Sequence, residues 1–323
     1  MKDNATIGVM DWPSPARNRF MAQGFLSPSN RARFLAMGLL LAGGVFWGDA
    51  YAVTETWLGN VSDISSNWSS AANWSGSPVR VPTSADLADL NNTAASYTAN
   101  FATNISTYTI SSFVVSNNSG NTTTLNINQG TLATGSASTA NILGSGGTIN
   151  INNTGVLKTA FALSVSAGDL TVNSGGVFTN TSTTATVTVT NGGVVSMQGG
   201  QLVTSKLTLL PTAVLDFGLT TPGANNPIRI AATGGLILDG TVNVNDLGGF
   251  TTGTYLLMTY TGTLTDNGLN VGTLPAGFNA TVDNSTAGQV NLDVTAIPEP
   301  STILLSGCGL AALWLRRGRR RTS

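Results

Sequence analysis

The chain has 323 residues, of which 41% are hydrophobic and only 9% are charged, so it can bury a sizeable core beneath an unusually uncharged surface. Arginines gather near both ends, and the segment between Val53 and Ile297 has four basic against eleven acidic side chains. This balance argues against a nucleic-acid partner. Histidine is absent and cysteine occurs once, which removes the commonest general base, the usual transition-metal ligand and any internal disulfide. We therefore expect no cofactor and no metal.

Residues 1–52 have the pattern of an export signal with a lead-in. Arg31 and Arg33 precede an apolar run, Phe34 to Gly48, and Ala50 and Ala52 form a small-x-small cleavage pattern. Signal peptidase is then the expected processing partner, and the mature chain is expected to start near Val53. The alternative is an uncleaved anchor, but the apolar run is shorter than the roughly 20 residues that a spanning helix needs.

Residues 53–95 are predicted to form a tryptophan-rich N-terminal cap made of short strands. The spacing of Trp57, Trp68 and Trp74 does not suit one face of a helix. The indoles could form an aromatic platform for sugars or a packed plug over the open end of a sheet, and the plug is favoured because buried tryptophan dominates core packing. The W-x-G and A-x-N-W-x-G patterns followed by Pro82 resemble the opening of exported bacterial β-helix passengers related to autotransporters. The resemblance implies a fold and no activity.

Residues 96–233 contain an imperfect repeat of alternating strands and Asn/Gly-rich turns. Its units begin at Thr124, Thr148, Asp169, Thr186 and Lys206, and the spacing between successive starts is uneven. A period of about twenty residues suits one coil of a β-solenoid, in which each strand pairs in parallel with its equivalent in the next coil. An antiparallel sandwich of hairpins is the alternative. The predicted fold class is all-β: a right-handed parallel β-solenoid (β-helix) with antiparallel capping strands, flanked by an N-terminal signal helix and a C-terminal membrane helix.

Period-two alternation predicts which side chains of the repeats point into the core. The expected inward set is Leu125, Ile127, Ile149, Ile151, Leu170, Val172, Val187, Val189, Leu207 and Leu209. Corners with positive φ are expected at Gly175-Gly176 and Gly192-Gly193. Asparagines recur beside these corners, where stacked amides could hydrogen-bond from coil to coil: Asn128, Asn152, Asn173 and Asn191.

Residues 234–296 are predicted to close the solenoid as a C-terminal β cap. The segment from Gly253 to Tyr260 and the final V-x-L-x-V of Val290 to Val294 are similar to the last strands of autotransporter-type passengers. Their hairpin-like alternation predicts antiparallel strands. Such a cap would protect a parallel edge that otherwise templates aggregation.

Two groups of polar residues are candidates for chemistry. Pectin-lyase-like solenoids carry acidic clusters or calcium with a basic residue on one face, which draws attention to Lys206, Asp216, Arg229, Asp239 and Asp246. No two acids lie at alternate positions of one strand, so we expect no catalytic residues and no enzyme. Asn243, Asn245 and Asp246 could bind calcium, but they lack the acidic spacing of an EF-hand loop and turn chemistry is favoured.

Residues 297–323 form a tail of three parts. The rigid step Pro298-Glu299-Pro300 precedes an apolar run, Thr302 to Leu315, which would reach only about 21 Å as a helix and would span a membrane marginally. A terminal cluster of arginines would remain cytoplasmic: Arg316, Arg317, Arg319, Arg320 and Arg321. Cys308 is expected to be an apolar filler within the run.

This order of parts closely resembles the PEP-CTERM sorting signal of Gram-negative bacteria. The resemblance implies that an exosortase recognises Pro298, Glu299 and Pro300 and processes the chain, commonly in bacteria that make exopolysaccharide. The expected route is an inner-membrane intermediate followed by the cell surface or extracellular matrix. The predicted function is a non-enzymatic surface or matrix protein, with exopolysaccharide as a possible partner; the alternative is a carbohydrate-binding or carbohydrate-active β-helix protein.

Overall fold

The computed structural model describes residues 52–298, except 59–66, 78, 92–94, 104–106, 136–139, 181, 225–226 and 232–234. Within these ranges the secondary structure is β-strand, with one turn of 3-10 helix, η2 (Ala71–Asn73). The signal helix expected in residues 1–52 and the membrane helix expected after Pro298 lie outside the described residues. In the described part, no helix is long and apolar enough to cross a membrane.

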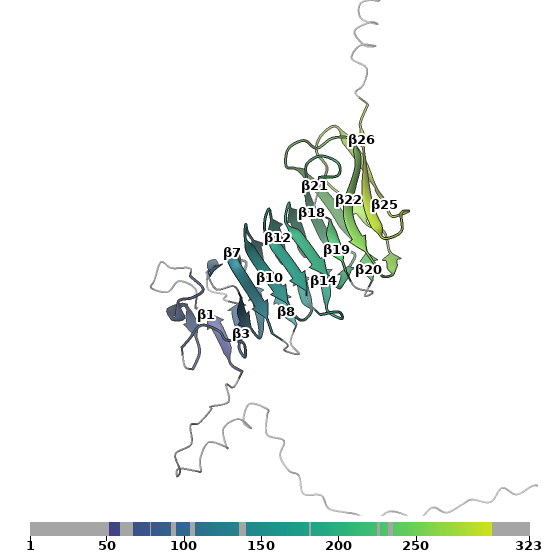
Figure 1. The fold of residues 1–323 in the computed structure, drawn as a ribbon. Helices are drawn as coiled ribbons and strands as arrows, with labels where there is room; N and C mark the ends of the chain where they lie inside the picture. The colour runs from purple at the N-terminus through teal and green to yellow at the C-terminus, as the bar shows by residue number, and fades with distance from the viewer. Residues whose placement is uncertain are drawn as a thin grey trace, which may run out of the picture. The chain divides into compact units, whose positions relative to one another are not determined.

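The chain is a β-solenoid of about seven turns in which successive strands enter three sheets, A, B and C, in that order (Figure 1). Sheet A contains, in spatial order, β2 (Trp74–Ser75), β1 (Thr54–Trp57), β3 (Leu87–Asn91), β6 (Ser112–Ser116), β8 (Asn141–Leu143), β11 (Leu163–Ser166), β14 (Thr186–Thr190), β17 (Lys206–Leu209), β20 (Leu236–Leu238) and β23 (Leu264–Asp266). Sheet B contains β4 (Tyr97–Ala102), the first half of β7 (Thr123–Thr134), β9 (Gly147–Ile151), β12 (Asp169–Asn173), β15 (Val194–Gln198), β18 (Val214–Leu219), β21 (Thr241–Asp246) and β24 (Asn270–Val271).

Sheet C contains the second half of β7 and short strands from the other coils. Each of these strands pairs with the equivalent strand of a neighbouring coil. Its members are β5 (Tyr108–Ile110), β7, β10 (Gly155–Thr159), β13 (Val177–Asn180), β16 (Gln201–Thr204), β19 (Ile228–Ile230), β22 (Gly253–Tyr260), β26 (Gln289–Ala296) and β25 (Phe278–Asp283). From β3 to β24, strands of neighbouring coils are parallel, as the repeat predicts. The antiparallel sandwich is therefore wrong for this part of the chain.

The core is a set of apolar ladders inside the three sheets. Leu125, Ile149 and Leu170 are successive partners in sheet B, and all three are fully buried. The whole predicted inward set is at most 1% exposed, so the alternation prediction is confirmed. Each coil thus buries its apolar side chains against those of the coils on both sides, which a single coil could not do alone.

The true period differs from the predicted one because two kinds of corner look alike in sequence. The units at Thr124, Thr148 and Asp169 cross from sheet B to sheet C, whereas those at Thr186 and Lys206 cross from sheet A to sheet B. Asp169 and Thr186 therefore begin strands of different sheets, and the short spacing between them is not the length of a coil. The true coils of sheet B, which vary in length, are marked by its register partners: Leu125, Ile149, Leu170, Val195, Leu215 and Val242.

The paired glycines at the corners have two different functions. Gly175 and Gly192 have φ of +77° and +78°, as predicted for positive-φ corners. Gly176 and Gly193 are not among the residues with positive φ; a Cβ there would overlap the carbonyl oxygens of Ile151 and Val165 in the preceding coil. The second glycine is needed because the backbone passes so close to the neighbouring coil.

The N-terminal end of the core is closed by the three tryptophans. Trp57, Trp68 and Trp74 are at most 2% exposed and pack edge to face around Trp74, with ring centroids 4.9 and 4.7 Å apart. The Trp74 indole N–H donates to the Trp68 carbonyl oxygen at 2.9 Å. The packed plug is thus confirmed, and these rings are too buried to form a sugar platform.

The C-terminal end is closed by antiparallel strands, but fewer than the sequence suggested. β22 and β25 each pair antiparallel with β26. β20, β21, β23 and β24 instead continue the parallel ladders, so the prediction of antiparallel pairing is wrong for those strands of residues 234–296. β22 belongs to both arrangements, because it pairs in parallel with β19 and antiparallel with β26. Figure 1 shows β25 and β26 at the yellow end of the described chain.

Ile149 and Ile142 offer a matched test of the core because both lie in one coil. Ile149 is fully buried, whereas Ile142 is 41% exposed on sheet A. We expect Ile149→Ala to lower the free energy of unfolding by about 2–5 kcal/mol, because it leaves a cavity. Ile142→Ala should lower it by less than about 1 kcal/mol. Urea denaturation followed by circular dichroism measures both, and equal losses would contradict the assigned inward face.

Candidate functional site

The outward side chains of sheet B are mostly polar and uncharged. One outward-facing position recurs in seven consecutive strands of the sheet and is half-buried in each; we call these residues the polar column: Asn100, Asn126, Asn150, Thr171, Ser196, Asp216 and Asn243. Because parallel strands are about 4.8 Å apart, the column offers hydrogen-bonding groups at a regular spacing.

Side-chain amides connect the N-terminal half of the polar column. Asn126 donates to the Asn100 side-chain oxygen at 2.9 Å, and Asn150 donates to that of Asn126 at 2.9 Å. At the other end, Asn243 donates to Asp216 Oδ1 at 2.8 Å. This ladder was not predicted from the sequence, although the shared N-x-N of Asn126 to Asn128 and Asn150 to Asn152 was visible there.

A second asparagine ladder lies at the corner between sheets B and C. Asn152 donates to the Asn128 side chain at 2.7 Å, and Asn173 donates to that of Asn152 at 2.8 Å. These three residues stack as predicted. Asn191 does not join them because it lies at a corner between sheets A and B, where it has a φ of +53° and donates to Ser166 Oγ at 2.9 Å.

The residues considered for catalysis are not brought together by the fold. Lys206 begins β17 in sheet A, Asp216 lies on β18 in sheet B, and Arg229 lies on β19 in sheet C. Asp239 accepts a hydrogen bond from the Gly240 amide, and Asp246 accepts from the amides of Gly248 and Phe250. A small pocket beside β18 is lined by Met197, Phe217, Leu247 and other uncharged residues.

The oxygen-rich run from Asn243 to Asp246 is used in local structure. Asn243 contacts Asp216 and accepts from the Thr273 amide, while Asp246 organises the turn after β21. Asp246 thus organises a turn as expected, whereas Asn243 lies within β21 and bonds to its neighbouring strand and to Thr273. Among the described residues there is no group of three or more His, Cys, Asp or Glu side chains placed to hold a metal ion.

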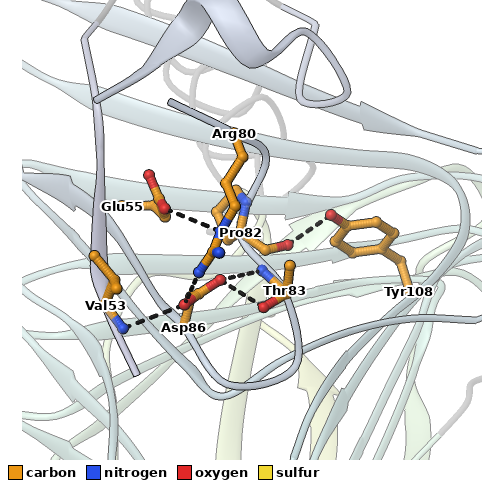
Figure 2. Close-up of polar contacts among 7 residues, drawn as sticks. All are labelled: Val53, Glu55, Arg80, Pro82, Thr83, Asp86 and Tyr108. Carbon is orange, nitrogen blue, oxygen red and sulfur yellow. Dashed lines mark hydrogen bonds and ion pairs between the residues drawn. The ribbon is translucent and has the colours of Figure 1, made fainter. Parts of the chain in front are cut away.

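Beside the tryptophan plug lies a buried ionic cluster that no sequence pattern predicted (Figure 2). Glu55 and Asp86 are both 0% exposed, and the Arg80 guanidinium is placed at both: its Nη2 is 2.7 Å from Asp86 Oδ1 and its Nε is 3.3 Å from Glu55 Oε1. Asp86 also accepts hydrogen bonds from the Thr83 amide and hydroxyl at 2.7 and 2.6 Å, and from the Val53 amide at 3.2 Å.

The two carboxylates have opposite environments. Burial alone raises the pKa of Asp86, but the hydrogen bonds from Thr83, Val53 and Arg80 outweigh it, so that its pKa lies below the usual range. Burial raises the pKa of Glu55, the charge of Asp86 adds to the effect, and Arg80 only partly opposes it. Neither oxygen of Glu55 has a hydrogen-bond partner among the described residues. The negative charge of Glu55 is thus less well compensated than that of Asp86.

The structure describes little of the predicted processing sites. Ala52 is exposed, and β26 ends at Ala296, after which the Ile297 amide donates to the Gly277 carbonyl oxygen at 2.9 Å. Ala50, Glu299, Pro300 and the arginine cluster lie outside the described residues. The last strand of the solenoid therefore ends immediately before Ile297.

Two comparisons with known proteins agree with this organisation. A PEP-CTERM protein-sorting motif matches residues 296–321, so the chain carries this sorting signal at its C-terminus. The chain is also similar to the adhesin BmaC autotransporter of Brucella suis biovar 1 (strain 1330), with 38% identity over 104 residues. That match covers 32% of this chain and 3% of the adhesin, so the chain spans only a small part of this curated relative. Together they imply an exported surface protein whose sorting depends on an exosortase.

The corner ladder should contribute measurably to stability. Asn152→Ala removes the hydrogen bonds to both Asn128 and Asn173, so we expect the free energy of unfolding to fall by about 1–2 kcal/mol. Asn153→Ala, at an exposed position on the same turn, should change it by less than about 0.5 kcal/mol. Urea denaturation of the two variants checks this, and similar values for both would mean that the ladder contributes nothing.

Proposed function

We propose that this protein is a non-enzymatic adhesive component of the cell surface or extracellular matrix, with a rigid β-solenoid as its working part. The observation that carries the proposal is the order of parts: the sorting motif begins at Ala296, the last residue of the strand that closes the solenoid. A folded domain followed directly by a sorting signal is the organisation expected of a protein that is exported as cargo. The similarity to an autotransporter adhesin supports an adhesive role for that cargo.

In this proposal the tail determines delivery. Pro298, Glu299 and Pro300 form the step that an exosortase recognises, and proline on both sides of the glutamate prevents that step from extending β26. The apolar run from Thr302 to Leu315 holds the chain in the inner membrane before processing, with the arginines after it on the cytoplasmic side. The tail is removed or exchanged when the passenger reaches the surface.

The polar column and its neighbouring threonines are the surface that we assign to adhesion. Thr98, Thr124 and Thr148 form an adjacent outward row on sheet B. Hydroxyl and amide groups can exchange hydrogen bonds with the hydroxyls of a polysaccharide without requiring a charge on the ligand. A polar face that repeats from coil to coil suits a long, repeated ligand better than a single small molecule. Exopolysaccharide is the ligand class that fits.

Delivery through the tail can be tested in the native host. Replacing Pro298, Glu299 and Pro300 by alanine should abolish surface exposure of the passenger, measured by protease accessibility on intact cells, because the recognition step is lost. The passenger should remain folded. Alanine at Thr322 and Ser323, which lie outside the matched motif, should leave exposure unchanged. Undiminished surface exposure of the triple variant would sink the sorting assignment.

Adhesion through sheet B can be tested with matched threonines. Thr171 and Thr188 are both half-buried, outward-facing residues, the first in sheet B and the second in sheet A. Thr171→Arg should reduce retention of cells on exopolysaccharide-coated surfaces several-fold, because a long side chain would project from sheet B and keep the polysaccharide away from it. Thr188→Arg should not. Equal retention of both variants would argue against sheet B as the binding face.

A further inference from the structure

The ionic cluster beside the plug has one cation for two buried carboxylates. Glu55 and Asp86 are fully buried and Arg80 is 30% exposed, so with all three ionised the cluster has a net charge of −1. Buried charge without compensation is unfavourable. No other described residue offers a second cation to it: the ion pairs of the described part are the two made by Arg80.

The backbone nitrogen of Val53 also lies at the cluster. Its N–H donates to Asp86 Oδ1 at 3.2 Å (Figure 2). Its carbonyl oxygen accepts from the Leu87 amide at 3.0 Å. Both backbone polar groups of Val53 are therefore hydrogen-bonded, the carbonyl oxygen to β3 and the N–H to the turn before it. The residue on its other side, Ala52, is exposed. A peptide nitrogen brings no charge to Asp86, whereas an amino terminus at the same place would bring a full positive charge.

We propose that hydrolysis of the Ala52–Val53 peptide bond creates a second cation for the cluster, with the α-ammonium group of Val53 forming a buried ion pair with Asp86. The inference rests on export, and so on the proposed function, but it assigns a structural role to the processed end. One water is consumed: its hydroxyl joins the Ala52 carbonyl carbon and its hydrogen joins the Val53 nitrogen. At neutral pH the new carboxyl group loses a proton and the new amine binds one.

The ion pair would alter the whole cluster. A charged donor usually approaches a carboxylate to about 2.7–2.9 Å, closer than the amide does here. Two cations would then balance two carboxylates. Arg80 could then compensate mainly the charge of Glu55, which has no hydrogen-bond partner among the described residues. Because β1 carries Glu55 and Trp57 and pairs with β3, the new end would fasten the first strand of sheet A to the plug.

The pair predicts a specific loss of stability at alkaline pH. An α-amino group in an unfolded chain has a pKa of about 8, and attraction to Asp86 raises it in the folded chain. The stabilisation is therefore complete below about pH 8 and is lost as the pH rises through the folded pKa. Glu55, Arg80, Asp86 and Tyr108 face the same site, and burial followed by the charge of Asp86 raises the pKa of Tyr108.

The test uses the full chain, exported with its own signal and purified in detergent. N-terminal sequencing should find Val53. A control chain with Gly-Ser inserted between Ala52 and Val53 is cleaved in the same way, but the insertion separates its ammonium group from Asp86. Between pH 7 and pH 10 the urea midpoint of the native chain, measured by pulse proteolysis, should fall further than that of the control. The other titrating groups are common to both chains.

A second measurement does not depend on a variant. At pH 7 a free α-amino group reacts with acylating reagents faster than lysine because its pKa is lower, about 8 against about 10.4. In the folded chain we expect the reverse order, with the Val53 amine labelled more slowly than the exposed Lys158. A different mature N-terminus, parallel pH profiles or faster labelling of Val53 would each overturn the ion pair and leave sorting by the C-terminal motif intact. If the chain has Val53 as its N-terminus but fails to reach the surface, the sorting assignment is overturned and the ion pair is left intact.

Discussion

The structure depends on one constraint: every coil must return the chain to a position directly beside its equivalent strand in the coil before. Parallel strands satisfy their backbone hydrogen bonds only across this short distance, and the buried apolar ladders require the same register. The coils of sheet B differ in length, yet all of them meet this condition. Two of the corners use paired glycines, Gly175-Gly176 and Gly192-Gly193, in which the first glycine turns the chain and the second allows close approach of the backbone.

The same constraint explains why polar side chains line up. When inward residues form ladders, outward residues must form ladders too, and asparagine uses this register by donating from one coil to the next. The polar column therefore results from the stacking and also stabilises it. A surface produced in this way is repetitive and carries few charges. This repetition is why we favour adhesion to a repeating ligand.

Both ends of such a stack expose unsatisfied edges, and this chain closes them by different means. At the N-terminal end, edge-to-face packing of Trp57, Trp68 and Trp74 seals the core, and the Arg80 cluster lies next to it. At the C-terminal end, β25 and β26 change direction and end the parallel ladder. The two predicted processing points lie beside these closures, so the folded unit coincides with the segment that we expect to remain after export.

The sequence alone determined the features that depend on local pattern. Alternation identified the inward residues, the repeat predicted a solenoid, the preference of tryptophan for buried positions indicated a plug, and the tail predicted its sorting motif. Only the tertiary structure decided the features that depend on which strands meet. It showed that Thr186 begins a strand of sheet A, that Gly176 is needed for close approach, and that Asn126 stacks between coils. Glu55 and Asp86 lie far apart in the chain, and no local pattern predicts a contact that arises from pairing β1 with β3.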